Sequence, residues 1–89
     1  RKEFVLSRQV LRSGTAVGAL IRESEHAQSR ADFISKMSIA LKEANETEYW
    51  IDLLHQSDYI DQTKYNSIHP DIVELLKLLV SIVITSRNH

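Results

Sequence analysis

The fold is decided by residues 29–57, SRADFISKMSIALKEANETEYWIDLLHQS. Apolar or small side chains recur there at spacings of four and three residues, the period of a helix that faces a partner helix. This seam consists of Phe33, Met37, Ala40, Ala44, Thr47, Ile51 and Leu54. Ser29 and Asp32 resemble a capping box, so the helix is predicted over residues 30–57. At 1.5 Å per residue it is about 40 Å long, and its seam needs an equally long partner.

A helix is also predicted before this stretch, over residues 3–27. Its apolar positions return to one helical face at steps of four and seven residues: Leu6, Val10, Val17 and Ile21. Gly14 and Gly18 lie near that face, although a glycine inside a helix costs about 1 kcal/mol relative to alanine. The glycines are interpreted either as a kink near Gly14 or as the close approach of a neighbouring helix.

The third predicted helix covers residues 62–87. Residues 58–61 form the turn before it, and Asp61 is the predicted N-cap. Pro70 interrupts the pattern. Because proline removes one helical hydrogen bond and clashes with the preceding turn, we expect a kink or a short break there.

The C-terminal part of this third helix is apolar on every side. Ten apolar residues lie between Ile72 and Ile84, and a helix of that kind is expected to be buried all round. Two other helices cannot cover it, so the sequence predicts a homo-oligomer. The fold class is predicted to be all-α, with three helices in one domain over residues 1–89. The two glycines and one proline argue against a strand-and-turn protein.

Composition excludes several classes of protein. The chain has no cysteine, which excludes disulfide frameworks and thiolate metal sites and fits a cytoplasmic location. The apolar stretch at 72–84 is too short and too charged to span a bilayer, and no targeting segment is visible. Because the first residue is not methionine, the start is interpreted as a processed or truncated end. The net charge of −1 excludes a uniformly basic nucleic-acid binder.

The charges are nevertheless unevenly distributed. Residues 1–22 hold five basic residues and one acidic residue, whereas residues 23–61 hold three basic and nine acidic residues. On a helical projection, a sector of about 80° that points away from the apolar face contains Arg1, Arg8, Arg12, Arg22 and also His26. Arginine suits phosphate because its planar fork donates two hydrogen bonds at once.

This arginine stripe allows two interpretations. It is either a solvated face whose arginines pair with acidic residues of a neighbouring subunit, or a surface that binds nucleic-acid phosphates. The candidate nucleic-acid-binding residues are Arg8, Arg12 and Arg22. A bend at Gly14 would move Arg22 out of the stripe and weaken the second interpretation.

No enzyme, metal or cofactor is predicted. Glu23 and His26 have the Glu-x-x-His spacing of bundle metal sites, and Asp52 and His55 offer a carboxylate at the same spacing; Glu43 and Glu46 would complete the set. The first pair, however, lies on the side away from the predicted core. No nucleophile elbow and no phosphate-binding glycine loop occurs. The aromatic pair at 49–50 is interpreted as a packing or interface anchor, with base stacking as the alternative.

The sequence resembles a known family. Residues 11–19, LRSGTAVGA, are similar to the RSGTSIGAN segment of the 23S ribosomal RNA intervening-sequence protein family, and the similarity continues through Glu23, Ala27–Ser29, Asp32–Ile34, Ser38–Ala40, Glu43–Trp50 and Leu78–Ser86. The chain departs from the family at Leu20, where asparagine is usual, and at His69–Pro70.

The resemblance implies a bacterial, antiparallel up-down four-helix bundle. This chain holds the second to fourth helices and lacks the family's first helix, and related members assemble as five-fold rings. Some members are encoded inside ribosomal RNA genes, and a similar bundle contacts RNA and a reverse transcriptase through a basic surface. We therefore expect a non-enzymatic homo-oligomer, a pentamer by resemblance, that binds RNA or DNA as a scaffold. The alternative is a protein–protein interaction module without nucleic-acid binding. Of the candidate arginines, only Arg12 lies within the matched family segment.

Overall fold

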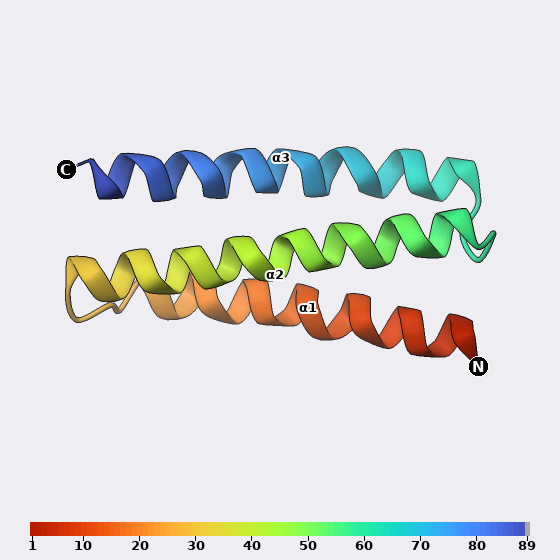
Figure 1. Ribbon diagram of the computed structural model, residues 1–89, viewed down its shortest axis with the longest axis horizontal. Helices are drawn as coiled ribbons and strands as arrows, with labels where there is room; N and C mark the ends of the chain where they lie inside the picture. The colour runs from red at the N-terminus through yellow and green to blue at the C-terminus, as the bar shows by residue number, and fades with distance from the viewer. Residues whose placement is uncertain (89) are drawn as a thin grey trace.

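The computed structural model describes residues 1–88 and contains three α-helices (Figure 1). These are α1 (Lys2–Ser24), α2 (Arg30–Gln56) and α3 (Gln62–Arg87). Successive helices run in opposite directions, and the described residues contain no strand. The predicted all-α, up-down class is therefore confirmed.

Two side-chain caps set where α2 and α3 begin. The Ser29 hydroxyl accepts a hydrogen bond from the Asp32 backbone N–H at 3.0 Å, and the Asp61 carboxylate accepts one from the Lys64 N–H at 2.8 Å. Each cap satisfies a backbone donor that has no partner inside the helix. Both predicted helix starts are confirmed. The Asp32 carboxylate also accepts from the Gln28 N–H at 3.1 Å, one residue earlier than a standard capping box requires.

The end of α1 differs from the prediction. The helix stops at Ser24 rather than Ala27, because the next three N–H groups bond three residues back in a tightened turn. His26 lies in this turn and not on the helix. Its predicted place in the arginine stripe, which assumed continuous helix, is therefore wrong.

The turn after α2 is an αL helix ending. Asp58 has φ = 63°, and the Tyr59 N–H donates to the Leu54 carbonyl at 2.9 Å while the Asp58 N–H donates to the His55 carbonyl at 3.1 Å. These two bonds are those of a Schellman motif, in which glycine usually takes the left-handed position. The motif turns the chain sharply, so that α3 starts beside the end of α2 (Figure 1).

The close helix approach predicted at the glycines does not occur within the described residues, and α1 is not broken at Gly14. Residues 2–24 form one uninterrupted helix, so there is no break near Gly14. A β-carbon built at Gly14 or Gly18 would meet nothing within 4 Å, so no helix approaches them closely. Both glycines are exposed.

The predicted break at Pro70 is also absent. α3 continues through Pro70 without interruption and shows no sharp bend (Figure 1). The Asn66 carbonyl loses its usual i+4 partner there, but Asn66 and Pro70 are exposed, so water can satisfy it. The tertiary packing of the apolar residues that follow outweighs the local cost of the proline.

Replacing Pro70 with alanine is expected to raise the free energy of unfolding by about 1–3 kcal/mol. The substitution restores a backbone donor in a helix interior and removes the ring clash. Urea unfolding followed by circular dichroism measures this change. Pro70→Gly should stabilise less than Pro70→Ala, because glycine has the lower helix propensity. An alanine variant less stable than the wild type would show that the ring itself contributes packing.

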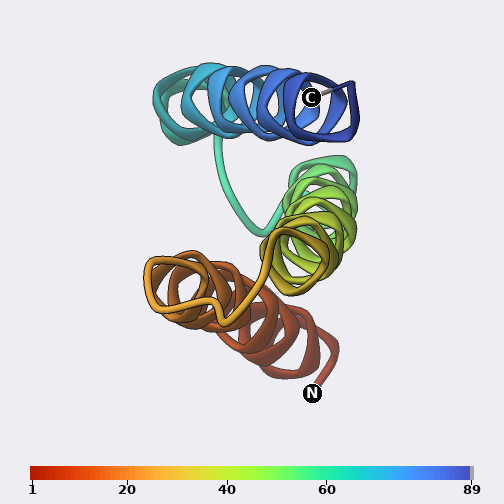
Figure 2. The same cartoon turned by 90° about the vertical axis from the view of Figure 1, so that its left-hand side faces the viewer.

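α2 is the central helix of the structure. It lies against α1 on one side and α3 on the other (Figure 2), and no Cα atom of α1 comes within 8 Å of one in α3 among the described residues. The helices thus form a flattened layer with principal extents of 43 × 22 × 14 Å. One consequence is that α1 and α3 each keep a face that α2 does not cover.

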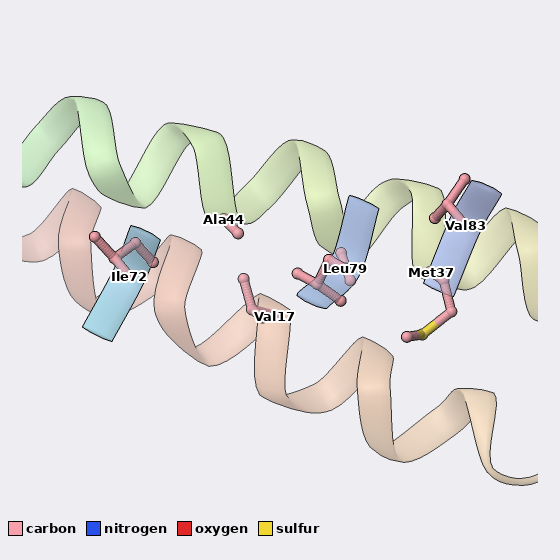
Figure 3. Close-up of a cluster of buried hydrophobic side chains, with 7 residues drawn as sticks. Val17, Met37, Ala44, Ile72, Leu79 and Val83 are labelled. Carbon is pink, nitrogen blue, oxygen red and sulfur yellow. The ribbon is translucent and has the colours of Figure 1, made fainter. Parts of the chain in front are cut away.

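The core follows the predicted α2 seam. All of its members are buried except Phe33, which packs partly buried against the cluster. The main cluster joins the three helices (Figure 3): Val17, Met37, Ala40, Ala44, Ile72, Leu79 and Val83. Ala40 and Ala44 are fully buried in the middle of the seam. Their small side chains let both neighbouring helices lie close to α2.

The ten apolar residues of α3 divide into covered and uncovered groups. Ile72, Leu79 and Val83 are buried against α2, whereas Leu78 and Ile84 remain 57% and 54% exposed and Val80 is also exposed. The expectation that this helix is buried on every side is therefore wrong for a single chain. The physical reason is that α2 and the shared core cluster cover only one side of the helix.

Candidate nucleic-acid interface

Arg8 lies on the exposed side of α1, as its place in the stripe predicts. Its guanidinium carbon lies 5.6 Å from the centroid of the Phe4 ring, one helical turn earlier. A cation–π contact of this kind holds the guanidinium while leaving its N–H groups available. Among residues 1–88, no carboxylate lies within 4.0 Å of the Arg8 side chain.

Arg12 differs, because it reaches across to α2. Its Nη2 lies 2.8 Å from Oε1 of Glu46 and its Nη1 lies 3.4 Å from Oε1 of Glu43. Its Nε donates to the side chain of Gln9 at 3.0 Å. The Arg12 side chain nevertheless remains 50% exposed. The sequence interpretation that paired these arginines with acidic residues thus holds for Arg12, but within one chain rather than between subunits.

Arg22 lies in the last turn of α1, where a positive charge interacts favourably with the helix dipole. Its side chain is exposed, and the described residues place no carboxylate within 4.0 Å of it. Arg22 follows Arg12 by ten residues, which is about 15 Å along the axis. Within the stripe, Arg8 and Arg12 therefore form a close pair and Arg22 is a separate cation.

A cleft of about 330 Å³ lies beside the close pair and is lined by Val5, Arg8, Gln9 and Arg12. It brings two guanidinium groups, an amide and an apolar side chain to one open surface. Two positive forks at helical i, i+4 spacing can bind one phosphate group or two successive phosphates. Sequence reasoning identified both arginines, but it did not identify Gln9 or Val5.

The aromatic pair is on α2. The Tyr49 and Trp50 rings meet edge to face, with centroids 4.9 Å apart at 70°. Tyr49 is 58% exposed, whereas the Trp50 indole nitrogen is buried and has no hydrogen-bond partner among the described residues. This arrangement matches a packing role for Trp50. Tyr49 lines a second cleft, on the outer face of α2, of about 520 Å³.

The structure regroups the candidate metal ligands. Asp52 is grouped with Glu48 of α2 and His69 of α3, and not with His55. The potential ligand atoms of these three side chains lie within 4.8 Å of one another. His69 Nε2 is 3.1 Å from Oε2 of Glu48 and 3.8 Å from Oδ1 of Asp52. In sequence, His69 is 17 residues from Asp52 and only tertiary packing brings it there.

Tyr65 supports this cluster. Its hydroxyl donates to Oδ1 of Asp52 at 2.7 Å, and its ring stacks on His69 at 4.7 Å and on His55 at 4.0 Å between centroids. The hydrogen bond to Asp52, together with desolvation and the charges of Asp52 and Glu48, raises the pKa of Tyr65 from 10.0 to about 12. The stacked rings hold His69 in place beside the two carboxylates.

Replacing Tyr65 with phenylalanine is expected to lower the free energy of unfolding by about 1 kcal/mol at pH 8, because one hydrogen bond to a carboxylate is lost. The folded pKa of Tyr65 lies above the unfolded value. Its contribution is therefore fully present below pH 10 and is lost as pH rises through about 12. Urea unfolding of both proteins at pH 8 and pH 11.5 measures this. A stability difference that stays constant over that range would contradict the assigned hydrogen bond.

None of the three helices, over the described residues, is long and apolar enough to cross a membrane.

Comparison with known proteins gives the family. Residues 1–81 match the family model described as 23S rRNA-intervening sequence protein. A crystal structure from Bacteroides thetaiotaomicron, of a protein with unknown function from the S23 ribosomal protein family, is similar to this chain at 63% identity. Its TM-score is 0.87, and the match covers 92% of this chain and 76% of that one. No curated protein matches significantly. The family predicted from residues 11–19 and the later segments is therefore confirmed, and this chain belongs to the 23S rRNA-intervening sequence protein family.

Proposed function

We propose that this protein is a non-enzymatic, cytoplasmic homo-oligomeric scaffold that binds the phosphates of RNA or DNA through the basic face of α1. The observation that carries this proposal is the cleft beside α1, where Arg8 and Arg12 share an open surface with Gln9. Contacts to phosphates hold a nucleic acid without reading its sequence. Arg22 extends the same helix face toward its C-terminal end.

The ion pairs of Arg12 with α2 affect how this residue can bind a phosphate. Glu46 and Glu43 occupy the Arg12 guanidinium, so a phosphate has to compete with these carboxylates. An exposed ion pair contributes only about 0–1 kcal/mol, so a doubly bonded phosphate can displace it. We infer that Arg8 and Arg22 attract the nucleic acid and that Arg12 changes partner on binding.

Oligomerisation is the second part of the proposal. Val80 and Ile84, one helical turn apart, form an exposed apolar patch on one face of α3, and fully burying each such side chain contributes roughly 1.5–3 kcal/mol. A neighbouring subunit can cover this patch. A ring of subunits, a pentamer by family resemblance, also repeats the few phosphate contacts of one chain, which raises the overall affinity.

The salt dependence of binding tests the nucleic-acid part. Fluorescence anisotropy with a labelled duplex DNA and a labelled single-stranded RNA should show affinity falling steeply with salt. The expected slope of log K against log salt is about −0.9 per phosphate neutralised on duplex DNA and about −0.7 on single strands. Binding that is absent at low salt, or independent of salt, would contradict the proposal and favour the protein–protein interaction module.

Charge variants at the cleft assign the residues. Arg8→Gln and Arg12→Gln should each weaken binding and reduce the salt slope by about one phosphate. Glu46→Gln should strengthen binding, because it frees Arg12 from its shorter ion pair at 2.8 Å. Lys64→Gln is the matched control, since Lys64 is exposed in the first turn of α3, away from α1 and from the Val80–Ile84 patch. Equal losses in the Arg8, Arg12 and Lys64 variants would indicate a response to net charge alone.

Sedimentation at micromolar concentration tests the assembly. We expect a species several times the 10.2 kDa chain mass, and Ile84→Ser should shift it toward smaller species. Thr85→Ser, at the next and also exposed position, changes no large apolar side chain and serves as the control. A monodisperse folded species of 10.2 kDa would contradict oligomerisation.

A further inference from the structure

We propose that Glu48, Asp52 and His69 form a site for a divalent transition-metal ion such as Zn²⁺, which would link α2 to α3. The three side chains supply two carboxylate oxygens and one imidazole nitrogen, and a mixed oxygen and nitrogen set is one that zinc accepts. This inference does not depend on nucleic-acid binding, and the residues lie outside the basic face of α1.

The distances between the donor atoms suit one ion. With metal–ligand bonds of about 2.1 Å, two donors in a tetrahedral arrangement lie about 3.4 Å apart. His69 Nε2 lies 3.1 Å from Oε2 of Glu48 and 3.8 Å from Oδ1 of Asp52, one shorter and one longer than this separation. Small rotations of the partly exposed side chains would place all three around a common centre. Three protein ligands leave the fourth position open to water.

Two helices supply the three donor side chains. Glu48 and Asp52 are one turn apart, so they project from the same face of α2. His69 comes from α3 and faces them across the helix interface. An ion bound here would therefore connect two helices, and its binding energy would stabilise the fold.

The surroundings also favour a cation. Among the described residues, no lysine or arginine lies within 4.0 Å of either carboxylate, and His69 is the partner that both share. By contrast, Glu43, Glu46 and Asp32 each pair with a lysine or arginine. Two carboxylates beside one imidazole thus hold negative charge that a divalent ion can neutralise.

A second layer of contacts orients the donors. The Tyr65 hydroxyl holds Oδ1 of Asp52 at 2.7 Å, and the Tyr65 ring stacks on His69. Outer groups that fix the orientation of ligands are a regular feature of metal sites, and removing one costs roughly 10–100-fold in metal affinity. These contacts orient Asp52 and His69, so a metal ion would find two of its ligands partly ordered.

Metal titration of the whole untagged chain tests the proposal. Zn²⁺ is titrated in competition with a chromophoric chelator, and Co²⁺ binding is followed by its visible absorption. We expect one ion per chain, with affinity at least about tenfold weaker in His69→Gln and Asp52→Asn, and weaker by about tenfold in Tyr65→Phe. His26→Gln, in the exposed turn after α1, is the matched control and should bind like the wild type.

Circular dichroism first establishes that each variant is folded. If His69→Gln does not fold, Glu48→Gln decides the question, because it removes one donor and keeps the side-chain shape. A saturating Zn²⁺ concentration should also raise the melting temperature of the wild type more than that of the ligand variants. Absence of saturable binding, equal affinity in His69→Gln, or loss of binding in His26→Gln would each overturn the proposal.

Discussion

Truncating Leu79 to alanine is expected to lower the free energy of unfolding by about 2–5 kcal/mol. Leu79 is 1% exposed and belongs to the cluster that joins the three helices (Figure 3). The loss is the sum of two costs: the hydrophobic transfer free energy of the removed atoms, and the free energy of the cavity that the neighbouring side chains do not fill. Since a domain of this size is stabilised by about 5–15 kcal/mol, the variant loses a large part of its stability.

Chemical denaturation gives the measurement for Leu79→Ala. The midpoint of a urea transition followed by circular dichroism should fall with an unchanged slope. Leu11→Ala is the matched control, because Leu11 is 70% exposed on α1 and its truncation should change stability by less than about 0.5 kcal/mol. Similar losses in both variants would mean that Leu11 is covered in the assembled protein, while a negligible loss at Leu79 would contradict the core assignment.

Enlarging Ala44 to leucine is expected to destabilise the protein by about 1–3 kcal/mol or more. Ala44 is fully buried in the middle of the α2 seam, where both neighbouring helices pack. The extra carbon atoms have no space there and must push α1 or α3 away from α2. Overpacking of this kind forces strained rotamers or backbone shifts.

The control for Ala44→Leu is Ala19→Leu on α1. Ala19 is exposed, and leucine has nearly the helix propensity of alanine, so this change should be close to neutral. Thermal and urea unfolding at one protein concentration compare the two variants. Full stability of Ala44→Leu would show that the helices can separate without cost, which would contradict the close packing around α2.

The two proposals for this protein concern different surfaces. Phosphate binding would use α1, where Arg8 and Arg12 line an open cleft. Metal binding would use the α2–α3 interface, where His69 meets two carboxylates. Their separation allows each to be tested while the other surface is intact, and the variants for one leave the residues of the other unchanged.

The sequence alone determined the helices, two of their starts and the main seam. Ser29 and Asp61 cap α2 and α3 as predicted, because capping depends on a side chain and a backbone N–H only three residues away. The α2 seam was predictable because an amphipathic period records which face is buried. The arginines at 8 and 22 are exposed on α1 for the same reason.

Only the tertiary structure decided the remaining features, because they depend on how helices are positioned against one another. The Arg12–Glu46 and His69–Glu48 contacts are examples. Each depends on the relative rotation and register of two packed helices, which the sequence of one helix does not specify. Pro70 stayed helical because the packing of α3 against α2 outweighs a local penalty. The exposed patch around Ile84 exists because α2 covers one side of α3, a fact about the whole layer that no local pattern contains.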